Sequence, residues 1–238
     1  MRISHFLYFS VFGISTVLFK KKRPILGTVI LTDECNLSCK HCAVNNIRKI
    51  HYPYGDILKE MQSLYSEGVR ILFFCGGEAF LWRDGDKNLR FLVQKARETG
   101  FYIVNVVTNG TLDLNIPGVD IIFLSLDGLK ETHNLIRGDT FDKILANVEK
   151  AKNQNICVYM AINRLNYQDI RGVADLVREH PRLGSISFNF HTPYEGTGEL
   201  TLTAEEKRKC VQEVQALIKA GYPVFNLSAS LDHFLKNK

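Results

Sequence analysis

Three cysteines within eight residues constrain this chain more than any other feature of its sequence. Cys35, Cys39 and Cys42 follow the spacing C-x3-C-x2-C, and they make up half of the six cysteines in the chain. Thiolates are soft metal ligands, and a short loop can turn three of them toward one point. Four such ligands close a structural metal site, whereas three can leave one coordination position open for chemistry. The spacing therefore predicts a metal or cluster site with a free position.

The charge and the cysteine content narrow the classes of protein to consider. The net charge is +5 over 238 residues, and the run Lys20-Lys21-Lys22-Arg23 alone carries four positive charges. Without that run the chain is nearly neutral, so we expect no nucleic-acid partner. Six cysteines in a chain this long do not suggest a disulfide framework. This cysteine content favours the reducing cytoplasm as the location.

Residues 1–24 form an apolar segment followed by a basic run. Residues 6–19 are apolar and rich in aromatic side chains. A bilayer-spanning helix needs about 20 apolar residues, and a secretory signal carries its positive charges before its apolar run. Two interpretations stay open. The segment is either a helix packed on the domain or a membrane-interface anchor formed by residues 3–23, whose basic residues face anionic lipid. A spanning helix is the minor alternative.

Short apolar runs and helical patterns alternate from residue 25 onward. This alternation predicts an α/β fold with a parallel sheet and helices outside it. Residues 193–238 are expected to complete the domain with a loop, a long helix capped by Thr203, a short strand at 223–227 and a terminal helix. The expected strands are 28–32, 69–74, 102–107, 120–126, 156–162 and 185–190, and the expected helices between them are 56–66, 89–99, 141–152 and 168–179.

Each chemically unusual group of residues falls just after an expected strand. In parallel α/β folds the carboxyl ends of the strands meet at one edge of the sheet, and sites are built there. The six groups should therefore lie close together. They are the cysteine segment 35–42, Cys75 to Glu78, Thr108 to Gly110, Ser125 to Gly128, Asn163 with Arg164, and His191 with Thr192.

The cysteine spacing together with Gly76-Gly77-Glu78 resembles the radical S-adenosylmethionine (radical SAM) superfamily. The core is similar to that of the SPASM and viperin-like group, without its cysteine-rich C-terminal extension. The resemblance implies a partial (βα)6 TIM-like barrel over residues 25–192 that holds a [4Fe-4S] cluster. Three irons would take Cys35, Cys39 and Cys42, and the fourth would bind S-adenosylmethionine (SAM). Reductive cleavage of SAM would give a 5′-deoxyadenosyl radical that abstracts hydrogen from a substrate.

The resemblance also implies roles for individual residues. Polar side chains at strand ends contact the ribose or other parts of SAM in this family, and His41 would flank its adenine. An arginine placed like Arg137 pairs with the methionine carboxylate in relatives, which suits a guanidinium fork. For most of these residues the alternative is an ordinary turn or surface position. The expected cofactor-binding residues are His41, Gly76, Gly77, Glu78, Ser125, Asp127, Arg137 and Asn163.

The substrate is not specified by any single residue. The loop after the sixth strand is the best candidate for substrate contact, and it contains His191, Tyr194 and Glu195. Peptide, nucleotide and lipid substrates stay open. The resemblance implies an external electron donor such as flavodoxin or ferredoxin, and the N-terminal segment leaves a membrane surface open as a further partner.

Two alternatives to a radical SAM enzyme follow from the same residues. One is a structural zinc-binding module, and the other is a family member that binds a partner without catalysis. The sequence also departs from the family pattern, because Ala79 stands where proline commonly follows the Gly-Gly-Glu segment. Only Cys210 follows residue 190, so we expect no auxiliary cluster within this sequence.

Overall fold

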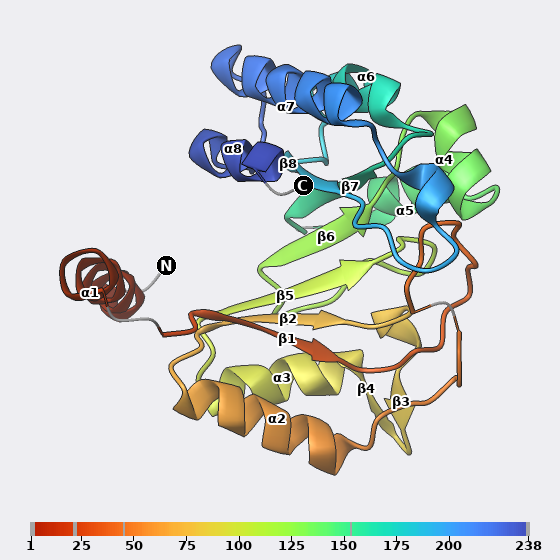
Figure 1. The fold of residues 1–238 in the computed structure, drawn as a ribbon. Helices are drawn as coiled ribbons and strands as arrows, with labels where there is room; N and C mark the ends of the chain where they lie inside the picture. The colour runs from red at the N-terminus through yellow and green to blue at the C-terminus, as the bar shows by residue number, and fades with distance from the viewer. Residues whose placement is uncertain (1–2, 21–22, 45, 153, 237–238) are drawn as a thin grey trace.

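Six parallel strands form one curved sheet whose spatial order is the order of the strands in the chain. The structure is a computed structural model that describes residues 3–20, 23–44, 46–152 and 154–236. The outermost strands β1 and β8 do not pair with each other, so the barrel stays open on one side (Figure 1). The predicted partial (βα)6 barrel is confirmed. Its strands are β1 (Leu26–Ile30), β2 (Ile71–Cys75), β5 (Ile103–Thr108), β6 (Ile121–Ser125), β7 (Ile156–Ile162) and β8 (Ser185–Phe190).

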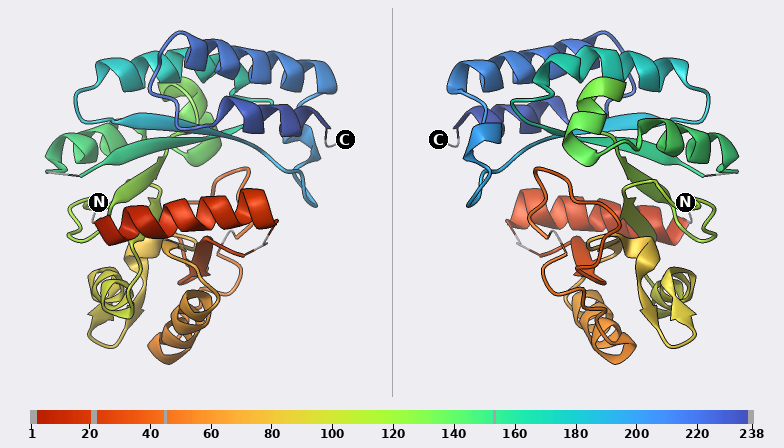
Figure 2. Two further views of the ribbon diagram at one scale, coloured as in Figure 1. Left: turned by 90° about the vertical axis from the view of Figure 1, so that its left-hand side faces the viewer. Right: turned by 90° about the vertical axis from the view of Figure 1, so that its right-hand side faces the viewer.

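Helices connect successive strands and cover the outside of the sheet (Figures 1 and 2). Because the strands are parallel, each connection must return the chain to the amino edge, and a helix does this compactly. A two-stranded hairpin and three short 3-10 turns fill the remaining connections. The helices are α1 (Ile3–Phe19), α2 (Tyr54–Ser66), α3 (Leu89–Thr99), α4 (Lys130–Arg137), α5 (Phe141–Lys150), α6 (Ile170–Glu179), α7 (Ala204–Lys219) and α8 (Ser228–Lys236); the hairpin strands are β3 (Arg83–Asp84) and β4 (Lys87–Asn88), and the 3-10 turns are η1 (Ala79–Leu81), η2 (Tyr167–Asp169) and η3 (Gly198–Leu200).

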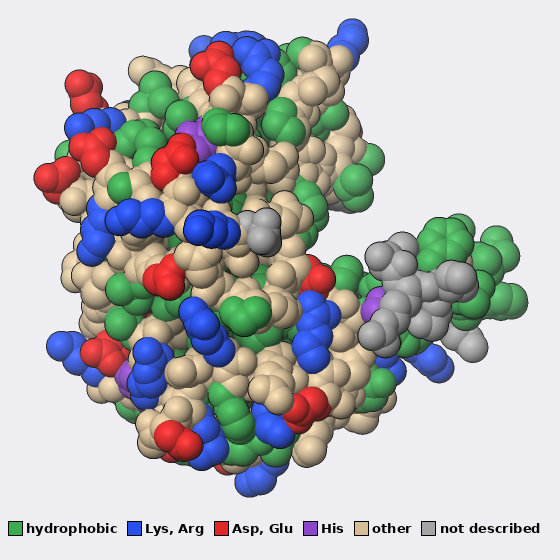
Figure 3. All heavy atoms as spheres, turned by 180° about the vertical axis from the view of Figure 1, so that it is seen from behind, with side chains coloured by type: hydrophobic (Ala, Val, Ile, Leu, Met, Phe, Trp, Pro, Cys, Tyr) green, Lys and Arg blue, Asp and Glu red, His purple; other side chains and the backbone are tan. Residues whose placement is uncertain are grey.

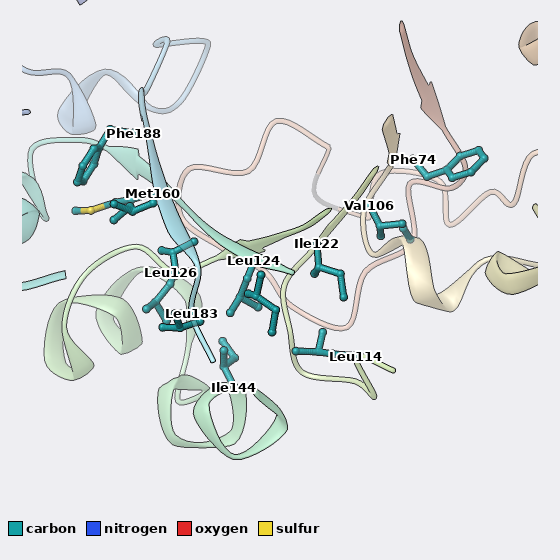
Figure 4. Packing of buried hydrophobic residues seen from close by; sticks show 14 of the residues in the cluster. Phe74, Val106, Leu114, Ile122, Leu124, Leu126, Ile144, Met160, Leu183 and Phe188 are labelled. Carbon is teal, nitrogen blue, oxygen red and sulfur yellow. The ribbon is translucent and has the colours of Figure 1, made fainter. Parts of the chain in front are cut away.

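The hydrophobic core lies between the sheet and the helices that cover it (Figure 4). Leu124 of β6 and Ile144 of α5 are both fully buried there. Burying a side chain of this size stabilises the fold by roughly 1.5–3 kcal/mol relative to leaving it exposed. The core therefore fixes the strands firmly, and the loops at their carboxyl ends start from defined positions.

The expected strand at 223–227 is wrong. The segment makes only one isolated parallel bridge, from Val224 to Ile186 of β8. Farther along, the side chain of Asn226 takes the place of a backbone partner. Its Oδ1 accepts from the Phe188 backbone N–H at 2.7 Å, and its Nδ2 donates to the Phe188 carbonyl at 2.8 Å. The side-chain amide satisfies the strand edge, so no ladder continues.

Helix α1 lies apart from the other described helices, on the side where the strands begin (Figure 1). Its first turns contact the barrel through aromatic residues. The His5 ring stacks on Tyr102 with ring centroids 4.1 Å apart, and the Tyr8 hydroxyl donates to the Gly68 carbonyl at 2.7 Å. The helix expected in the N-terminal segment is confirmed. Among the described residues, no helix combines the length and apolar character that crossing a membrane requires.

Candidate active site

The three clustered cysteines line one pocket at the carboxyl edge of the sheet. The pocket has a volume of about 220 Å³. Its walls come from the cysteine loop after β1 and from the ends of β2, β5 and β6, together with the last residue of α4. The lining residues are Cys35, Cys39, His41, Cys42, Gly76, Gly77, Val107, Thr108, Asn109, Ser125 and Arg137. Because these loops follow strands of one parallel sheet, most of the candidate site residues from the sequence lie together at this edge.

Side chains within the loop hold the cysteine segment in place. The Asp33 carboxylate accepts from the backbone N–H groups of Arg48 and Ile50, which ties the start of the loop to its end. Asn46 bridges the loop interior, since its Oδ1 accepts from the Cys35 N–H and its Nδ2 donates to the Leu37 carbonyl at 3.1 Å. These local bonds replace the regular ladder that a loop lacks. The thiols are therefore presented by an ordered loop.

The glycine pair after β2 is required by the backbone of the cysteine loop. A Cβ on Gly76 would overlap the carbonyl oxygen of Thr32, and one on Gly77 would come within 2.8 Å of the Asp33 carbonyl oxygen. The Gly77 N–H donates to the Thr32 carbonyl at 2.7 Å. Only glycine leaves room for this close approach. The cysteine loop and the Gly-Gly-Glu segment therefore pack directly against each other.

Glu78, an expected cofactor contact, is fully buried at the carboxyl edge of the sheet. Its Oε1 accepts from the Thr108 hydroxyl at 2.8 Å and from the Phe80 N–H at 3.1 Å, and its Oε2 accepts from the Asn109 N–H at 2.7 Å. Burial raises the pKa of this carboxyl, and the hydrogen bonds oppose that rise. Glu78 therefore positions the turn after β5 and does not line the pocket.

Asp127 and Arg137 form a buried ion pair behind the cysteine loop. The Arg137 Nε donates to Asp127 Oδ2, and Asp127 Oδ1 accepts from the Ala161 N–H at 2.8 Å. Although burial opposes it, the adjacent guanidinium and the His41 ring hold the pKa of Asp127 below its usual range. The Asp127 side chain is fully buried and bonded within the protein, and its expected contact with a ribose stays a prediction.

The guanidinium of Arg137 also reaches into the cysteine site. Its Nη1 lies 3.7 Å from Cys39 Sγ and its Nη2 lies 3.4 Å from His41 Nε2. Burial raises the pKa of the Cys39 thiol to about 11, while the guanidinium works in the opposite direction. A thiolate here therefore depends on nearby positive charge, which a bound iron would supply.

Asn109 is a site residue that sequence reasoning classified as a turn former. Its Nδ2 lies 3.7 Å from Cys35 Sγ and 2.8 Å from Asn36 Oδ1. Its Oδ1 accepts from the Thr111 N–H at 2.9 Å, which fixes the orientation of the amide. The sequence held one sign of this role, because Asn109 directly follows the third strand and the other candidate site residues also follow strands.

Of the remaining expected cofactor contacts, Ser125 lines the pocket and Asn163 does not. Asn163 is fully buried, and its Oδ1 accepts from the Leu165 N–H at 2.9 Å. This is a turn closed by a side chain. The Asn163 side chain shapes the loop after β7, and its contact with the cofactor stays a prediction.

The loop after β8 approaches the cysteine loop from the other side. The rings of His191 and His41 are 6.3 Å apart and meet edge to face, and Tyr194 lies 6.0 Å beyond His191. His191 Nε2 is 3.2 Å from the Thr197 hydroxyl, which orients the ring. Glu195 is exposed in the same loop. The three expected substrate-contact residues therefore share one loop beside the pocket.

The donor set fits a thiolate-held cluster with a bound polar ligand. In the described part of the chain, no three His, Cys, Asp or Glu side chains converge on the position of one metal ion. The thiols are instead arranged around the pocket, next to the glycine pair. His41 Nδ1 is buried with no hydrogen-bond partner within the described residues. A polar atom of this kind at a pocket wall is suited to a ligand contact.

Comparison with known proteins decides the family. The family described as the radical SAM superfamily matches residues 29–177, which contain the cysteine loop and the glycine pair. The chain belongs to the radical SAM superfamily. Members of this family use a [4Fe-4S] cluster and SAM.

Curated relatives share this sequence over much of its length. Fe-coproporphyrin III synthase of Methanosarcina barkeri is 30% identical over 243 residues, covering 92% of this chain and 56% of the relative. The sporulation killing factor maturation protein SkfB of Bacillus subtilis is 30% identical over 181 residues, covering 69% of this chain and 42% of the relative. The chain thus spans about half the length of these relatives.

Solved structures share the fold. SuiB of Streptococcus suis, bound to its precursor peptide SuiA, superimposes with a TM-score of 0.70 at 15% identity, covering 90% of this chain and 52% of that one. The hydrogenase maturase HydG of Carboxydothermus hydrogenoformans gives a TM-score of 0.64 at 14% identity, covering 97% of this chain and 60% of that one. At these identities the similarity shows the architecture alone.

Proposed function

We propose that this barrel cleaves SAM reductively and starts a radical reaction on a separate substrate. When bound, the cluster would supply the one electron that cleaves SAM to methionine and a 5′-deoxyadenosyl radical, and this radical would take a hydrogen atom from the substrate to give 5′-deoxyadenosine. The observation that carries the proposal is the pocket lined jointly by Cys35, Cys39, Cys42 and the glycine pair. Residues 25–192 would provide this chemistry, and residues 193–238 would complete the domain around it.

The three thiols would hold three irons and leave the fourth iron facing the pocket. Cys39 is 8% exposed, so little water reaches the sulfur on that side. Excluding water protects a reactive intermediate and strengthens the electrostatic contacts inside the site. The backbone at Gly76 and Gly77 lines the same pocket and offers a surface without side chains against which SAM can lie. His41, with its unpartnered Nδ1, would lie beside the adenine.

Arg137 and Ser125 would orient SAM. The guanidinium lines the pocket while Asp127 fixes its Nε, so only its outer edge can face the methionine carboxylate. A fixed fork loses little freedom when it binds a carboxylate. Ser125 ends β6 in the pocket wall and would meet the ribose hydroxyls. Asp127 would act through Arg137 as a positioning residue.

The substrate would enter beside the loop that carries His191, Tyr194 and Glu195. Two aromatic side chains next to an exposed carboxylate offer both stacking and hydrogen bonding. Relatives of this chain include a sporulation killing factor maturation protein, a GTP 3′,8-cyclase and an Fe-coproporphyrin III synthase, so the substrate class stays open. The electron would come from an external donor such as flavodoxin or ferredoxin, in the reducing cytoplasm.

Anaerobic reconstitution with iron and sulfide tests the proposal. Reduced protein supplied with SAM should release 5′-deoxyadenosine, and Cys39→Ala should abolish both the cluster absorbance and this product. Cys75→Ala is the matched control, because Cys75 lies next to the glycine pair but does not line the pocket. Stoichiometric zinc without iron would instead support the zinc module, and a loaded cluster without SAM cleavage would support a catalytically silent binding module.

A further inference from the structure

Helix α1 has two apolar faces, and the barrel covers only one of them. His5, Tyr8, Phe9 and Phe12 lie on one side, and each is partly buried. His5 and Phe9 contact the Tyr102 ring, with centroids 4.1 and 6.0 Å away. The guanidinium of Arg70 lies 5.1 Å from the Tyr8 ring centroid. This side holds the helix against the amino edge of the sheet.

The opposite side of α1 is a continuous stripe of exposed aliphatic residues. The stripe consists of Leu7, Val11, Ile14 and Leu18, which are 57%, 65%, 53% and 69% exposed. Their spacing of i, i+4, i+7 and i+11 places them on one line along the helix. Phe6 and Val17 flank the stripe at 59% and 76% exposure. The apolar surface projects from the body of the molecule (Figure 3). A contiguous apolar surface of this kind marks an interaction site.

The composition of α1 and its flank favours lipid as the occupant. The helix contains no acidic residue, and the run Lys20-Lys21-Lys22-Arg23 follows it directly. Ser15 and Thr16 donate their hydroxyls to the Phe12 carbonyl at 2.8 and 2.9 Å, so neither needs water. In lipid, polar groups must be satisfied internally. The apolar stripe would enter the acyl-chain region of an anionic membrane, and the basic residues that follow would face its headgroups.

The anchor and the active-site pocket lie at opposite edges of the sheet. Helix α1 contacts Tyr102, directly before β5, while Asn109, directly after β5, lines the pocket. The six residues of β5 separate the two edges by roughly 20 Å. Figure 1 shows α1 on the side where the strands begin, with the strand arrows pointing away from it.

We propose that α1 docks this protein on an anionic membrane surface through its exposed stripe and the basic run. The barrel is then held with its pocket facing away from the bilayer. Substrate and electron donor reach the pocket from the aqueous side, so the substrate is water-soluble and not a bilayer lipid. The docking itself does not depend on the cluster, whereas the orientation of the pocket rests on the function proposed above.

Sedimentation with vesicles tests the docking. Full-length reconstituted protein should pellet with phosphatidylcholine vesicles that contain phosphatidylglycerol, and much less with phosphatidylcholine alone. Lys20→Gln with Arg23→Gln should weaken this binding by roughly fivefold per charge. Val11→Gln with Leu18→Gln should weaken it by at least about tenfold, because two apolar side chains no longer enter the lipid. Leu227→Gln with Leu235→Gln is the control on exposed residues elsewhere, and it should bind normally.

Each possible outcome of these measurements bears on the proposal. Failure of the wild-type protein to bind anionic vesicles would overturn it. Concentration-dependent self-association without lipid, lost in the Val11/Leu18 variant, would also overturn it and identify a second copy of the chain as the occupant. Unchanged release of 5′-deoxyadenosine by vesicle-bound protein would support the outward-facing pocket, and inhibition by anionic vesicles would contradict that orientation. If no 5′-deoxyadenosine forms at all, the proposed reaction fails while vesicle binding still tests the docking.

Discussion

Gly76 shows how closely the two sequence motifs are joined at the scale of single residues. Its Cα faces the Thr32 carbonyl with no room for a methyl group. We expect Gly76→Ala to push the cysteine loop away from β2, so that the purified protein holds less than half the iron of the wild type. Gly55→Ala is the control, since a Cβ there meets nothing within 4 Å. Normal iron content in Gly76→Ala would show that the loop adjusts freely.

Two side chains from outside the cysteine loop donate toward its sulfurs. Asn109 Nδ2 and Arg137 Nη1 each lie 3.7 Å from a cysteine sulfur. Hydrogen bonds to sulfur stabilise the more negative, reduced cluster. Asn109→Ala should therefore lower the midpoint potential of the cluster, as measured by a redox titration followed by EPR. Asn115→Ala, at a partly buried asparagine outside the pocket, should leave the potential unchanged. An unchanged potential in an intact Asn109→Ala cluster would exclude this role.

His133 makes stability depend on pH. It is fully buried, its Nδ1 accepts from the Asp127 N–H, and burial lowers its pKa to about 4. An unfolded histidine titrates near 6.5, so acid protonates the unfolded chain first and stability falls as pH drops from 6.5 toward 4. Between pH 7.5 and pH 5, protonation of this one histidine in the unfolded chain should lower the free energy of unfolding by about 2 kcal/mol. Urea titrations of cluster-free wild type and His133→Gln should show a smaller pH dependence for the variant; equal dependence would contradict the assignment.

Individual site residues differ in how far the sequence could predict them. The grouping of Cys35, Cys39 and Cys42 at one pocket was predictable from their spacing, because a short loop can turn three thiols toward one point, and their role as cluster ligands stays a prediction. Asn109 was not, since an asparagine that closes a turn and one that donates to a sulfur look the same in sequence. Glu78 was placed correctly along the chain, but its burial depends on tertiary packing.

At the scale of elements, α4 links the sheet to the cysteine loop. The Lys40 N–H donates to the Ile136 carbonyl at 3.0 Å, and the next residue, Arg137, pairs with Asp127 after β6. Helix α4 was absent from the sequence-based assignment. The helix is only eight residues long and mostly polar, and only His133 and Ile136 are buried, so it offers too few apolar positions to be identified. The elements with longer apolar faces, such as α3, were predicted with the same limits.

The Asp127–Arg137 pair should dominate the stability of this link. Asp127→Asn leaves a buried guanidinium without its counterion, which typically costs 3–5 kcal/mol. We expect a loss of about 3 kcal/mol in the free energy of unfolding, measured in urea. Asp142→Asn removes an exposed partner of Lys130 and should change stability by less than about 0.5 kcal/mol. Equal losses in the free energy of unfolding for the two variants would show that the buried ion pair stabilises the fold no more than the exposed one.

At the scale of the whole molecule, the strand order follows from the sequence because successive strands usually lie side by side and right-handed crossovers allow few alternatives. The place of α1 did not follow in the same way. Its apolar residues fit a packed helix and an anchor equally well in sequence. The structure shows one face of α1 docked and the other exposed. The exposed face of α1 is therefore the basis for the proposed membrane docking.

The central claim is that three thiols leave one iron of the cluster open toward the pocket, where SAM binds. EPR and ENDOR spectroscopy of the reduced, reconstituted protein tests it most directly, using SAM labelled with magnetic isotopes in its amino and carboxylate groups. We predict that SAM shifts the cluster signal and that both labels couple to it, in the wild type and in Cys75→Ala. A cluster signal that SAM leaves unchanged, with no coupling to either label, would contradict the account.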